Sequence, residues 1–297
     1  MNIRDLIREH NRVINLADSK LERDLLLFQK QALVKLEAVL RQFSTVSGSL
    51  DFQSSDSFLL MKLRKELLEI FEGEVYTDSI KQYLSNFDKI EQIQKNKIIV
   101  TNKTLSQKLI NSIGLTAERK LIADEVARNL ISPTAISNTF IAPIQRVLYQ
   151  AVSYGATFGE TETAIRTIVV GSHRSQGLVS RYAKQITRDG LRQFSGSVSQ
   201  KVSDRLGLNA FVFVNELMPE DSRQNCIDMI NGTGAIGRFM KPGNIYLKED
   251  LPEMIKILRN GKGWNPATTA ATYFIYRNGY NCRHEAIPTS YNENFVN

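Results

Sequence analysis

The sequence predicts a mainly α-helical protein, in which a long-helix N-terminal region is followed by a small α+β C-terminal module. The first 132 residues contain no proline and only three glycines, which favours uninterrupted helices. Residues from 207 onward hold eight of the 17 glycines and five of the seven prolines, together with short aromatic and β-branched runs.

Helices in the first part of the chain are predicted from apolar residues that recur at three- and four-residue steps. Residues 45–57 are polar and predict a loop. Ser132-Pro133 is the expected N-cap and first-turn pair of a helix, and Gly207 is the expected C-cap of another. The predicted helices cover residues 20–43, 58–71, 78–93, 101–114, 116–131, 132–155, 160–172 and 177–207.

The C-terminal module shows strand signals of a different kind. "NAFVFVNE" alternates and predicts a strand, and "NGTGAIGRFMKPGNIYL" predicts a loop, a hairpin and a short strand. "EDLPEMIKILRNG" predicts a short helix closed by Asn260-Gly261. "TYFIYRNGYNC" is aromatic and β-branched, which favours a strand, and it turns at Asn278-Gly279 before the ending "GYNCRHEAIP".

The positive charge of the chain is concentrated in one segment. The net charge is +7, and residues 166–206 alone hold eight Lys/Arg against two Asp/Glu. We therefore expect three regions: helical residues 1–165, a basic connecting helix over 166–206, and the α+β module over 207–297. Five basic residues of the middle segment share one helix face: Arg174, Arg181, Lys184, Arg188 and Arg192.

This basic row has two interpretations. It is either a solvated helix face, or a surface that contacts a phosphate backbone or an acidic protein. Phosphate contacts need positive charge within reach and no particular motif. No helix-turn-helix, zinc finger or stacking platform is recognisable, so sequence-specific recognition of bases is not expected.

The two cysteines and the histidine near the C-terminus raise three alternatives. Cys226, Cys282 and His284 are a candidate metal set, but their spacing is not that of two paired C-x-x-C units. A Cys–His nucleophilic pair would also need an orienting group and an oxyanion site, which no motif marks. We expect neither a metal nor a cofactor, and interpret these residues as a cluster of buried side chains with a structural role.

The order of these segments resembles the C-terminal domain of phage head morphogenesis proteins, the family of the phage Mu gene F product. The likeness covers residues 178–290. A helix with "ITRDGLRQF" leads into a strand, "DSRQNC" follows, and the module closes on "GYNCRHEAIP". The family's D-x-R-T-C-x-x-C-like and H-P-x-C-R-C segments are matched by Asp221, Arg223, Cys226, Asn281, Cys282, Arg283 and Pro288. Gly279-Tyr280 stand in place of His-Pro, His284 stands in place of the second cysteine of C-R-C, and no second cysteine follows Cys226.

The resemblance implies a structural minor head protein of a tailed phage, without enzymatic activity. It implies portal or capsid proteins as partners, contact with packaged DNA, and a place in a virion assembled in the host cytoplasm. The alternatives are a hydrolase or transferase on the C-terminal module and a cellular nucleic-acid-binding protein. Exposed apolar stripes on the long helices predict an oligomer or a stable partner, and no apolar run is long enough to predict a membrane span.

Overall fold

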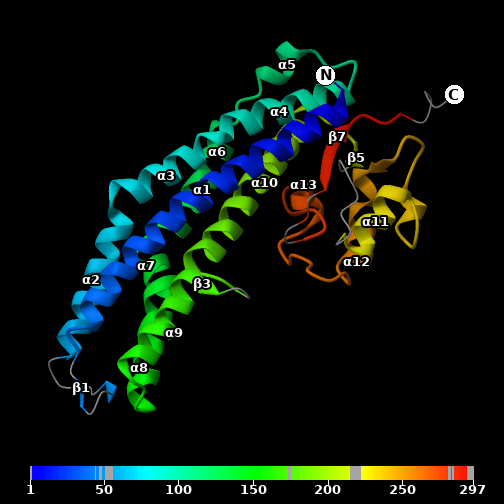
Figure 1. The fold of residues 1–297 in the computed structure, drawn as a ribbon. Coiled ribbons are helices and arrows are strands. Elements are labelled where there is room, and N and C mark those ends of the chain that lie inside the picture. The colour runs from blue at the N-terminus through cyan, green and yellow to red at the C-terminus, as the bar shows by residue number, and fades with distance from the viewer. Residues whose placement is uncertain are drawn as a thin grey trace. The chain divides into compact units, whose positions relative to one another are not determined.

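The computed structural model confirms the expected fold class: helices dominate, and one small sheet lies in the C-terminal part (Figure 1). The chain has 297 residues. The structure describes residues 2–43, 45–46, 49–50, 56–172, 175–214, 222–279, 282 and 284–292.

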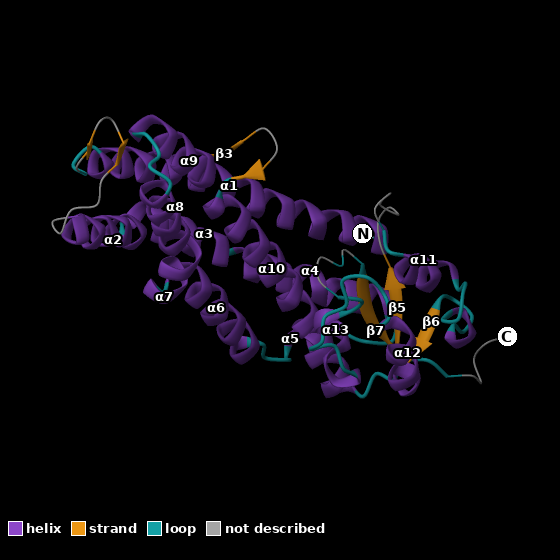
Figure 2. Ribbon diagram, turned by 90° about the horizontal axis from the view of Figure 1, so that it is seen from below, coloured by secondary structure: helices purple, strands orange, loops and turns teal. Residues whose placement is uncertain are grey.

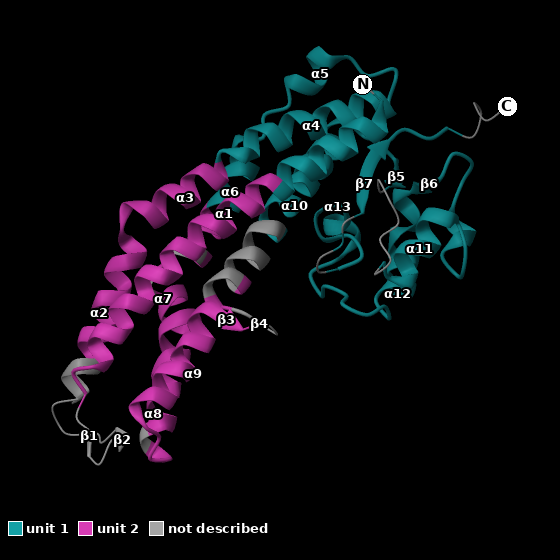
Figure 3. Cartoon of the chain, in the orientation of Figure 1, with its two compact units in different colours: residues 1–15, 85–123, 188–297 teal, residues 16–84, 124–187 magenta. Residues whose placement is uncertain are grey.

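The chain forms two compact units, and neither is continuous in sequence (Figure 3). Unit 1 contains residues 1–15, 85–123 and 188–297, and unit 2 contains residues 16–84 and 124–187. The three consecutive regions expected from composition therefore do not correspond to the compact units. Composition changes along the chain, whereas the units are defined by long-range packing that brings the first helix to the last strand.

Unit 2 is built from helices and two short hairpins. Its aromatic core includes Phe71, whose ring centroid lies 4.4 Å from that of Phe28 and 5.1 Å from that of Phe140. Its elements include most of α1 (Ile3–Leu40), β1 (Thr45–Val46), β2 (Ser49–Leu50), α2 (Asp56–Glu72), α3 (Glu74–Leu84), α7 (Pro133–Ile136), a π-helical turn (Ser137–Ile141), α8 (Ala142–Ser153), α9 (Phe158–Val170), β3 (Gly171–Ser172) and β4 (Ser175–Gln176).

Unit 1 combines helices with the three-stranded sheet. Helices α6 and α10 contribute residues to both units. The elements of unit 1 include α4 (Asn86–Thr101), α5 (Gln107–Asn111), α6 (Thr116–Ile131), α10 (Leu178–Leu206), β5 (Ala210–Val214), α11 (Gln224–Asn231), β6 (Ile245–Leu247), α12 (Leu251–Leu258), α13 (Tyr273–Tyr276), β7 (Glu285–Thr289) and three 3₁₀ turns (Gly237–Phe239, Lys248–Asp250, Ala270–Thr272).

The sheet of unit 1 is antiparallel and has the order β6-β5-β7 (Figure 2). Ala210 on β5 lies opposite Thr289 on β7 and Leu247 on β6, so two segments distant in sequence pair on either side of one strand. A buried core of aromatic and sulfur-containing side chains packs within this α+β part, and its members include Phe211, Met229, Tyr246, Met254, Tyr273, Phe274, Cys226 and Cys282.

Helices α4 and α10 are joined inside unit 1 by buried polar and aromatic contacts. The amide of Gln94 donates to Ser199 Oγ at 2.7 Å and accepts from Ser195 Oγ at 3.0 Å. The rings of Phe87 and Phe194 stack with centroids 4.7 Å apart. Because each buried polar atom of this set has a partner, the contact avoids the cost of unsatisfied burial.

A buried ion cluster connects β7 to two helices. Lys97 Nζ on α4 lies 2.7 Å and 2.6 Å from the two carboxylate oxygens of Glu285, the first residue of β7. His10 Nδ1 on α1 lies 2.9 Å from Glu285 Oε1, at ion-pair distance although not aligned as a hydrogen bond. All three side chains are buried, so the interactions among them must offset the cost of removing each one from water.

The charges of this cluster shift one another's proton affinity. Burial lowers the pKa of His10 to about 4 and that of Lys97 to about 8, against the opposing attraction of Glu285. Burial alone would raise the pKa of Glu285, but His10 and Lys97 outweigh it and hold that pKa below its usual range. Near pH 7 the cluster therefore contains a neutral His10, a charged Lys97 and a charged Glu285.

Several helix ends follow the expected chemistry. Ser132 Oγ accepts from the backbone N–H of Ala135 at 3.2 Å, with Pro133 as the first residue of α7. Helix α10 ends at Leu206, and Gly207 adopts a φ of 61°, as a C-cap glycine does.

Other boundaries differ from the expectations. Helix α1 begins at Ile3, well before the predicted start, and the predicted helix over 78–93 is broken at Ser85 between α3 and α4. The predicted loop after α1 includes the hairpin β1–β2. The predicted strand "TYFIY" is wrong: residues 273–276 form α13, because Tyr273 and Phe274 are buried in the α+β core from a helical turn.

Glu285→Gln should destabilise the chain by about 3–5 kcal/mol, because it leaves the buried Lys97 ammonium without its counter-charge. Urea denaturation followed by circular dichroism measures the change. The exposed Glu249→Gln is the matched control and should change the free energy of unfolding by less than about 0.5 kcal/mol. Equal midpoints for the two variants would contradict the structural role of the cluster.

The lowered pKa of His10 predicts a loss of stability in mild acid. The ordinary value of 6.5 applies to the unfolded chain and about 4 to the folded one, so the unfolded chain binds the extra proton between these values. The free energy of unfolding should therefore fall as the pH decreases from 6.5 to 4. His10→Gln should flatten this part of the profile, and parallel profiles for wild type and variant would exclude His10 as the source.

Candidate functional site

The two cysteines and His284 come together in the core of the α+β part of unit 1. Cys226 lies in the first turn of α11, and Cys282 and His284 precede β7. The ligand atoms of the three side chains all lie within 4.8 Å of one another, and all three residues are buried. We call Cys226, Cys282 and His284 the thiol–imidazole cluster.

The cluster is held by direct contacts of its own atoms. Cys282 Sγ lies 3.9 Å from His284 Nδ1, and the amide of Asn278 donates to Cys226 Sγ at 3.4 Å. The imidazole of His284 stacks on the ring of Phe213 from β5, with centroids 5.3 Å apart and planes 11° apart. The histidine ring is thereby fixed in orientation against the sheet.

The two thiols differ in proton affinity. The hydrogen bond between them raises the pKa of Cys226, and burial raises it further. The same hydrogen bond lowers the pKa of Cys282, helped by His284 and by the positive charge of Arg277, against the opposing effect of burial. The two buried thiols therefore titrate as a pair, in which the first proton lost is shared between the two sulfurs.

A turn between α13 and Cys282 positions the cluster. Arg277 adopts a left-handed φ of 52°, and its buried guanidinium donates to the carbonyls of His284 at 2.9 Å and Arg192 at 3.1 Å. Gly279 has a φ of 111°, and a Cβ there would lie 2.2 Å from the carbonyl oxygen of Gly263. The predicted turn at Asn278-Gly279 is confirmed, and only glycine fits its second position.

Asn278 links this turn to α11. Its side-chain oxygen accepts from the Tyr273 hydroxyl at 2.9 Å, and its backbone carbonyl accepts from Arg223 at 2.8 Å. Burial raises the pKa of Tyr273 well above its ordinary value, so its hydroxyl stays a donor. Arg223 thus contacts the turn that directly precedes the closing segment "GYNCRHEAIP".

A small cavity lies beside Cys282. Its volume is about 20 Å³, which is room for about one water molecule. It is lined by Asp189, Arg192, Gln193, Asn265, Ile275, Tyr276, Arg277, Gly279 and Cys282. The cavity has room for a solvent oxygen next to the thiol.

The signature residues expected from the sequence are partly placed. Four of them lie close together, as an interpretation as a buried structural cluster requires: Arg223, Cys226, Cys282 and His284. Asp221 and Arg283, two further signature residues, lie outside the described residues. Cys282 and His284 precede β7, which begins at Glu285.

The expected basic row is not continuous on the surface. Arg181 is exposed on α10, whereas Arg192 on the same helix is only 8% exposed and lines the cavity beside Cys282. Arg192 therefore does not belong to a solvent-facing row, because α13 and its following turn cover that part of α10. Arg174 lies outside the described residues, as do the side chains of Lys184 and Arg188.

No sequence pattern marks Tyr273 or the buried ion cluster of His10, Lys97 and Glu285 as part of a site, and Asn278 is marked only as a turn residue. Lys97 stands in the polar stretch Lys95-Asn96-Lys97, ahead of "IIV". No local pattern pairs it with Glu285, which lies 188 residues later in the chain. Only the tertiary fold brings these charges together.

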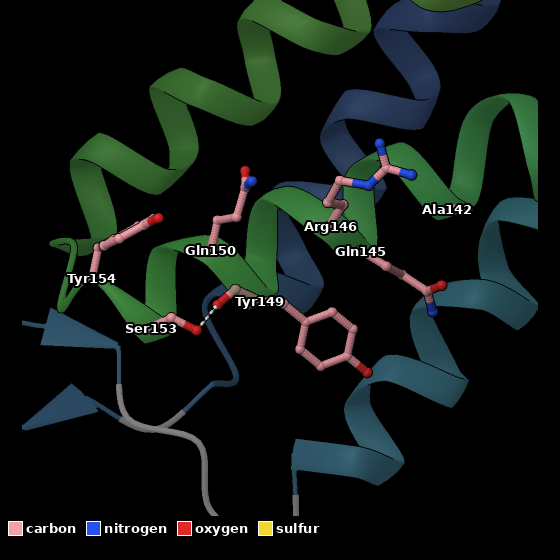
Figure 4. A pocket seen from close by; sticks show the side chains of 7 residues that line it. All are labelled: Ala142, Gln145, Arg146, Tyr149, Gln150, Ser153 and Tyr154. Atoms are coloured by element: carbon pink, nitrogen blue, oxygen red, sulfur yellow. Dashed lines mark hydrogen bonds between the residues drawn. The ribbon is translucent and has the colours of Figure 1, made fainter.

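A second hollow lies on the surface of unit 2 and was also not expected. Seven residues line it, six from α8 together with Tyr154, and its volume is about 390 Å³ (Figure 4). Tyr149 and Tyr154 are 55% and 84% exposed, and Ser153 Oγ donates to the carbonyl of Tyr149 at 2.8 Å. Its lining combines tyrosine, glutamine and serine side chains with the guanidinium of Arg146.

The thiol–imidazole cluster has the donor set of a zinc site. Two thiolates and one imidazole are ligands that Zn²⁺ prefers, and they would supply three of the four positions of a tetrahedral site. The lowered pKa of Cys282 favours ligation, whereas Cys226 must release its proton when a metal binds. Without a metal, the same residues form a packed and hydrogen-bonded cluster in the core.

In contrast to the expectation from the sequence, the buried donor set predicts that the reduced chain binds one equivalent of Zn²⁺ or Co²⁺, with proton release and a rise in the melting temperature. Calorimetry in buffers of different ionisation enthalpy measures the protons, and thiolate-to-cobalt absorption reports the ligands. Cys226→Ser and Cys282→Ser should each lose the absorption. Unchanged absorption in the double variant would place the metal elsewhere.

Comparisons with known proteins leave the thiol–imidazole cluster without a described counterpart. A scan against protein-family models and searches of curated proteins and of solved structures found no match to this chain. Within the described residues, no helix has the length and apolar character needed to cross a membrane. The functional interpretation therefore depends on the residues and contacts of the chain itself.

Proposed function

We propose that this chain is a structural minor head protein of a tailed phage. Its partners in this proposal are portal or capsid proteins, with non-specific contact to packaged DNA, and its location is the virion. The resemblance of residues 178–290 to head morphogenesis proteins motivates the proposal. The fold agrees with it in form, since a mainly helical chain carries a small α+β part.

One observation supports the proposal most directly. The two segments that carry the resemblance are separated by more than 50 residues, yet their cysteines and His284 lie within 4.8 Å in the core. A pair of segments with a common structural task is expected to meet in this way. Asn278, the residue before the second segment, contacts Cys226 and Arg223 of the first one.

The cluster favours a structural role over catalysis. Cys282 and His284 are 7% and 3% exposed, and the cavity beside them has room for about one water molecule. Nucleophilic catalysis requires the reacting atom of the substrate to approach to roughly 3 Å, which this cavity denies to anything larger than water. The enzyme alternative gains no support from this site.

Surface charge supplies the remaining support. Arg181 is exposed within the segment that holds most of the net positive charge. Positive charge at the surface is sufficient for non-specific contact with a phosphate backbone or an acidic protein. In the proposal, the helices carry the partner contacts and the α+β part is the structural module.

The proposal predicts that the chain co-purifies with phage heads. Heads isolated by density gradient from an induced host that carries the gene should contain the chain at a fixed ratio to the major capsid protein, as mass spectrometry would show. Deletion of the gene should reduce the number of infectious particles. A chain that remains in the soluble fraction while heads assemble normally would refute the proposal.

A thiol variant distinguishes the enzyme alternative in the same assay. Cys282→Ser retains shape and hydrogen bonding but is a poorer nucleophile, so heads should incorporate it as they do the wild type. Circular dichroism provides the control for folding. A folded Cys282→Ser chain that enters heads but leaves them non-infectious would favour chemistry at Cys282.

A further inference from the structure

The outer face of α1 in unit 2 has a regular pattern of apolar and basic residues. Six residues follow one another at steps of four and three along the helix, and they share one face. We call them the basic seam: Leu16, Lys20, Arg23, Leu27, Lys30 and Val34. The basic seam spans about 27 Å at 1.5 Å per residue.

All six side chains of the basic seam are exposed. Leu16, Leu27 and Val34 are 58%, 59% and 66% exposed, although each is large and apolar. The core of unit 2 is served by the opposite face of the same helix, where Leu21, Leu25, Phe28, Ala32 and Leu36 are buried. The apolar residues of the basic seam therefore do not stabilise the fold of unit 2.

The charge of this face has one sign. The basic seam contains three basic residues and no acidic one. Two acidic side chains of α1 are partly buried and paired: Asp24 Oδ2 lies 3.3 Å from Lys20 Nζ, and Glu37 Oε1 lies 2.5 Å from Arg166 Nη2. An incoming partner therefore meets three apolar side chains interleaved with Arg23, Lys30 and Lys20, of which Lys20 is already paired with Asp24.

The spacing is that of helix-to-helix packing. Steps of four and three residues place side chains along the contact line of two helices that cross at a small angle. A second copy of α1 is a poor occupant, because a parallel pair places Lys20 and Arg23 against themselves. An antiparallel pair centred on the seam places Lys20 against Lys30, so like charges meet in both orientations.

We propose that the basic seam docks an amphipathic helix of another protein, one that presents leucine-like residues to Leu16, Leu27 and Val34 and carboxylates to Lys20, Arg23 and Lys30. A nucleic acid offers phosphates to the basic residues but nothing that matches aliphatic leucine and valine, and base stacking requires aromatic platforms. An interfacial membrane helix typically adds Trp or Phe, which the basic seam lacks.

This inference deepens the proposed function and rests on it only in expecting protein partners for the helices. The docking site and the proposed function can be refuted independently of each other. Absence from phage heads would refute the proposed function and leave a measured affinity of the basic seam intact. Loss of the measured affinity would remove the docking site and leave head incorporation unaffected.

The test uses the full chain and a labelled 21-residue helical peptide with leucine opposite the apolar positions and glutamate opposite the basic ones. Fluorescence anisotropy should show binding of this peptide and none of the same peptide with lysine in place of glutamate. Arg23→Glu/Lys30→Glu should weaken binding by about tenfold or more. The matched control Arg64→Glu/Lys120→Glu reverses the same charges at exposed sites on α2 and α6 and should stay within about twofold.

The apolar half of the basic seam has its own variant. Leu27→Gln should also weaken binding of the acidic peptide, because it removes apolar area from the contact while keeping the charges. Circular dichroism confirms that each variant is folded. Equal affinity of the acidic and lysine peptides, or of wild type and Arg23→Glu/Lys30→Glu, overturns the proposal.

Two further experiments test whether the basic seam binds a polyanion or a second copy of this chain instead. If Arg23→Glu/Lys30→Glu loses affinity for duplex DNA or anionic vesicles but not for the acidic peptide, the surface is a polyanion site and the proposal is wrong. If the wild type self-associates in sedimentation and Leu27→Gln abolishes this, a second copy is the occupant and the proposal is again wrong.

Discussion

The carboxylate of Glu285 is the constraint on which unit 1 depends. It is buried at the start of β7, and it interacts with Lys97 from α4 and His10 from α1. A buried charge without its partners costs several kcal/mol, whereas a paired one contributes little net stability. The ion cluster therefore acts mainly on the specificity of the fold, because any shift of β7 against these helices would leave a buried charge unpaired. The register of β7 with β5 is tied to the same residue, since Glu285 lies opposite Val214.

The thiol–imidazole cluster is positioned by this constraint. His284 directly precedes Glu285, its carbonyl accepts from Arg277, and its ring stacks on Phe213 of the neighbouring strand. Cys282 is two residues earlier and reaches Cys226 on α11. Three features therefore fix the positions of Cys282 and His284: the ion cluster, the pairing of β7 with β5, and the turn at Gly279. Such a segment is suited to holding a core together, or to holding a metal in a fixed donor set, more than to moving during a reaction.

Local patterns predicted much of the helical architecture. The spacing of apolar residues located α2, α6, α9 and α10, and cap chemistry located the start of α7 and the end of α10. The break at Ser85 had no glycine or proline to mark it. Tyr273–Tyr276 has strand-like composition but forms a helix, because tertiary burial outweighs local preference. Within the candidate site, the cysteines and His284 were identifiable by residue type, whereas Arg277, Asn278 and Tyr273 became apparent only from their contacts.

The division of unit 1 into three separate stretches of sequence has a consequence for biosynthesis. Its first stretch, residues 1–15, is synthesised well before its last strand, β7, because about 270 residues separate them in the chain. Until Glu285 emerges, His10 and Lys97 have no carboxylate to receive them, and α4 lacks the strand that covers it. Unit 2 residues are all synthesised before residue 188, so unit 2 can fold first. A chain truncated ahead of β7 would therefore retain a folded unit 2 and an incomplete unit 1, so folding of the α+β part depends on the synthesis of β7.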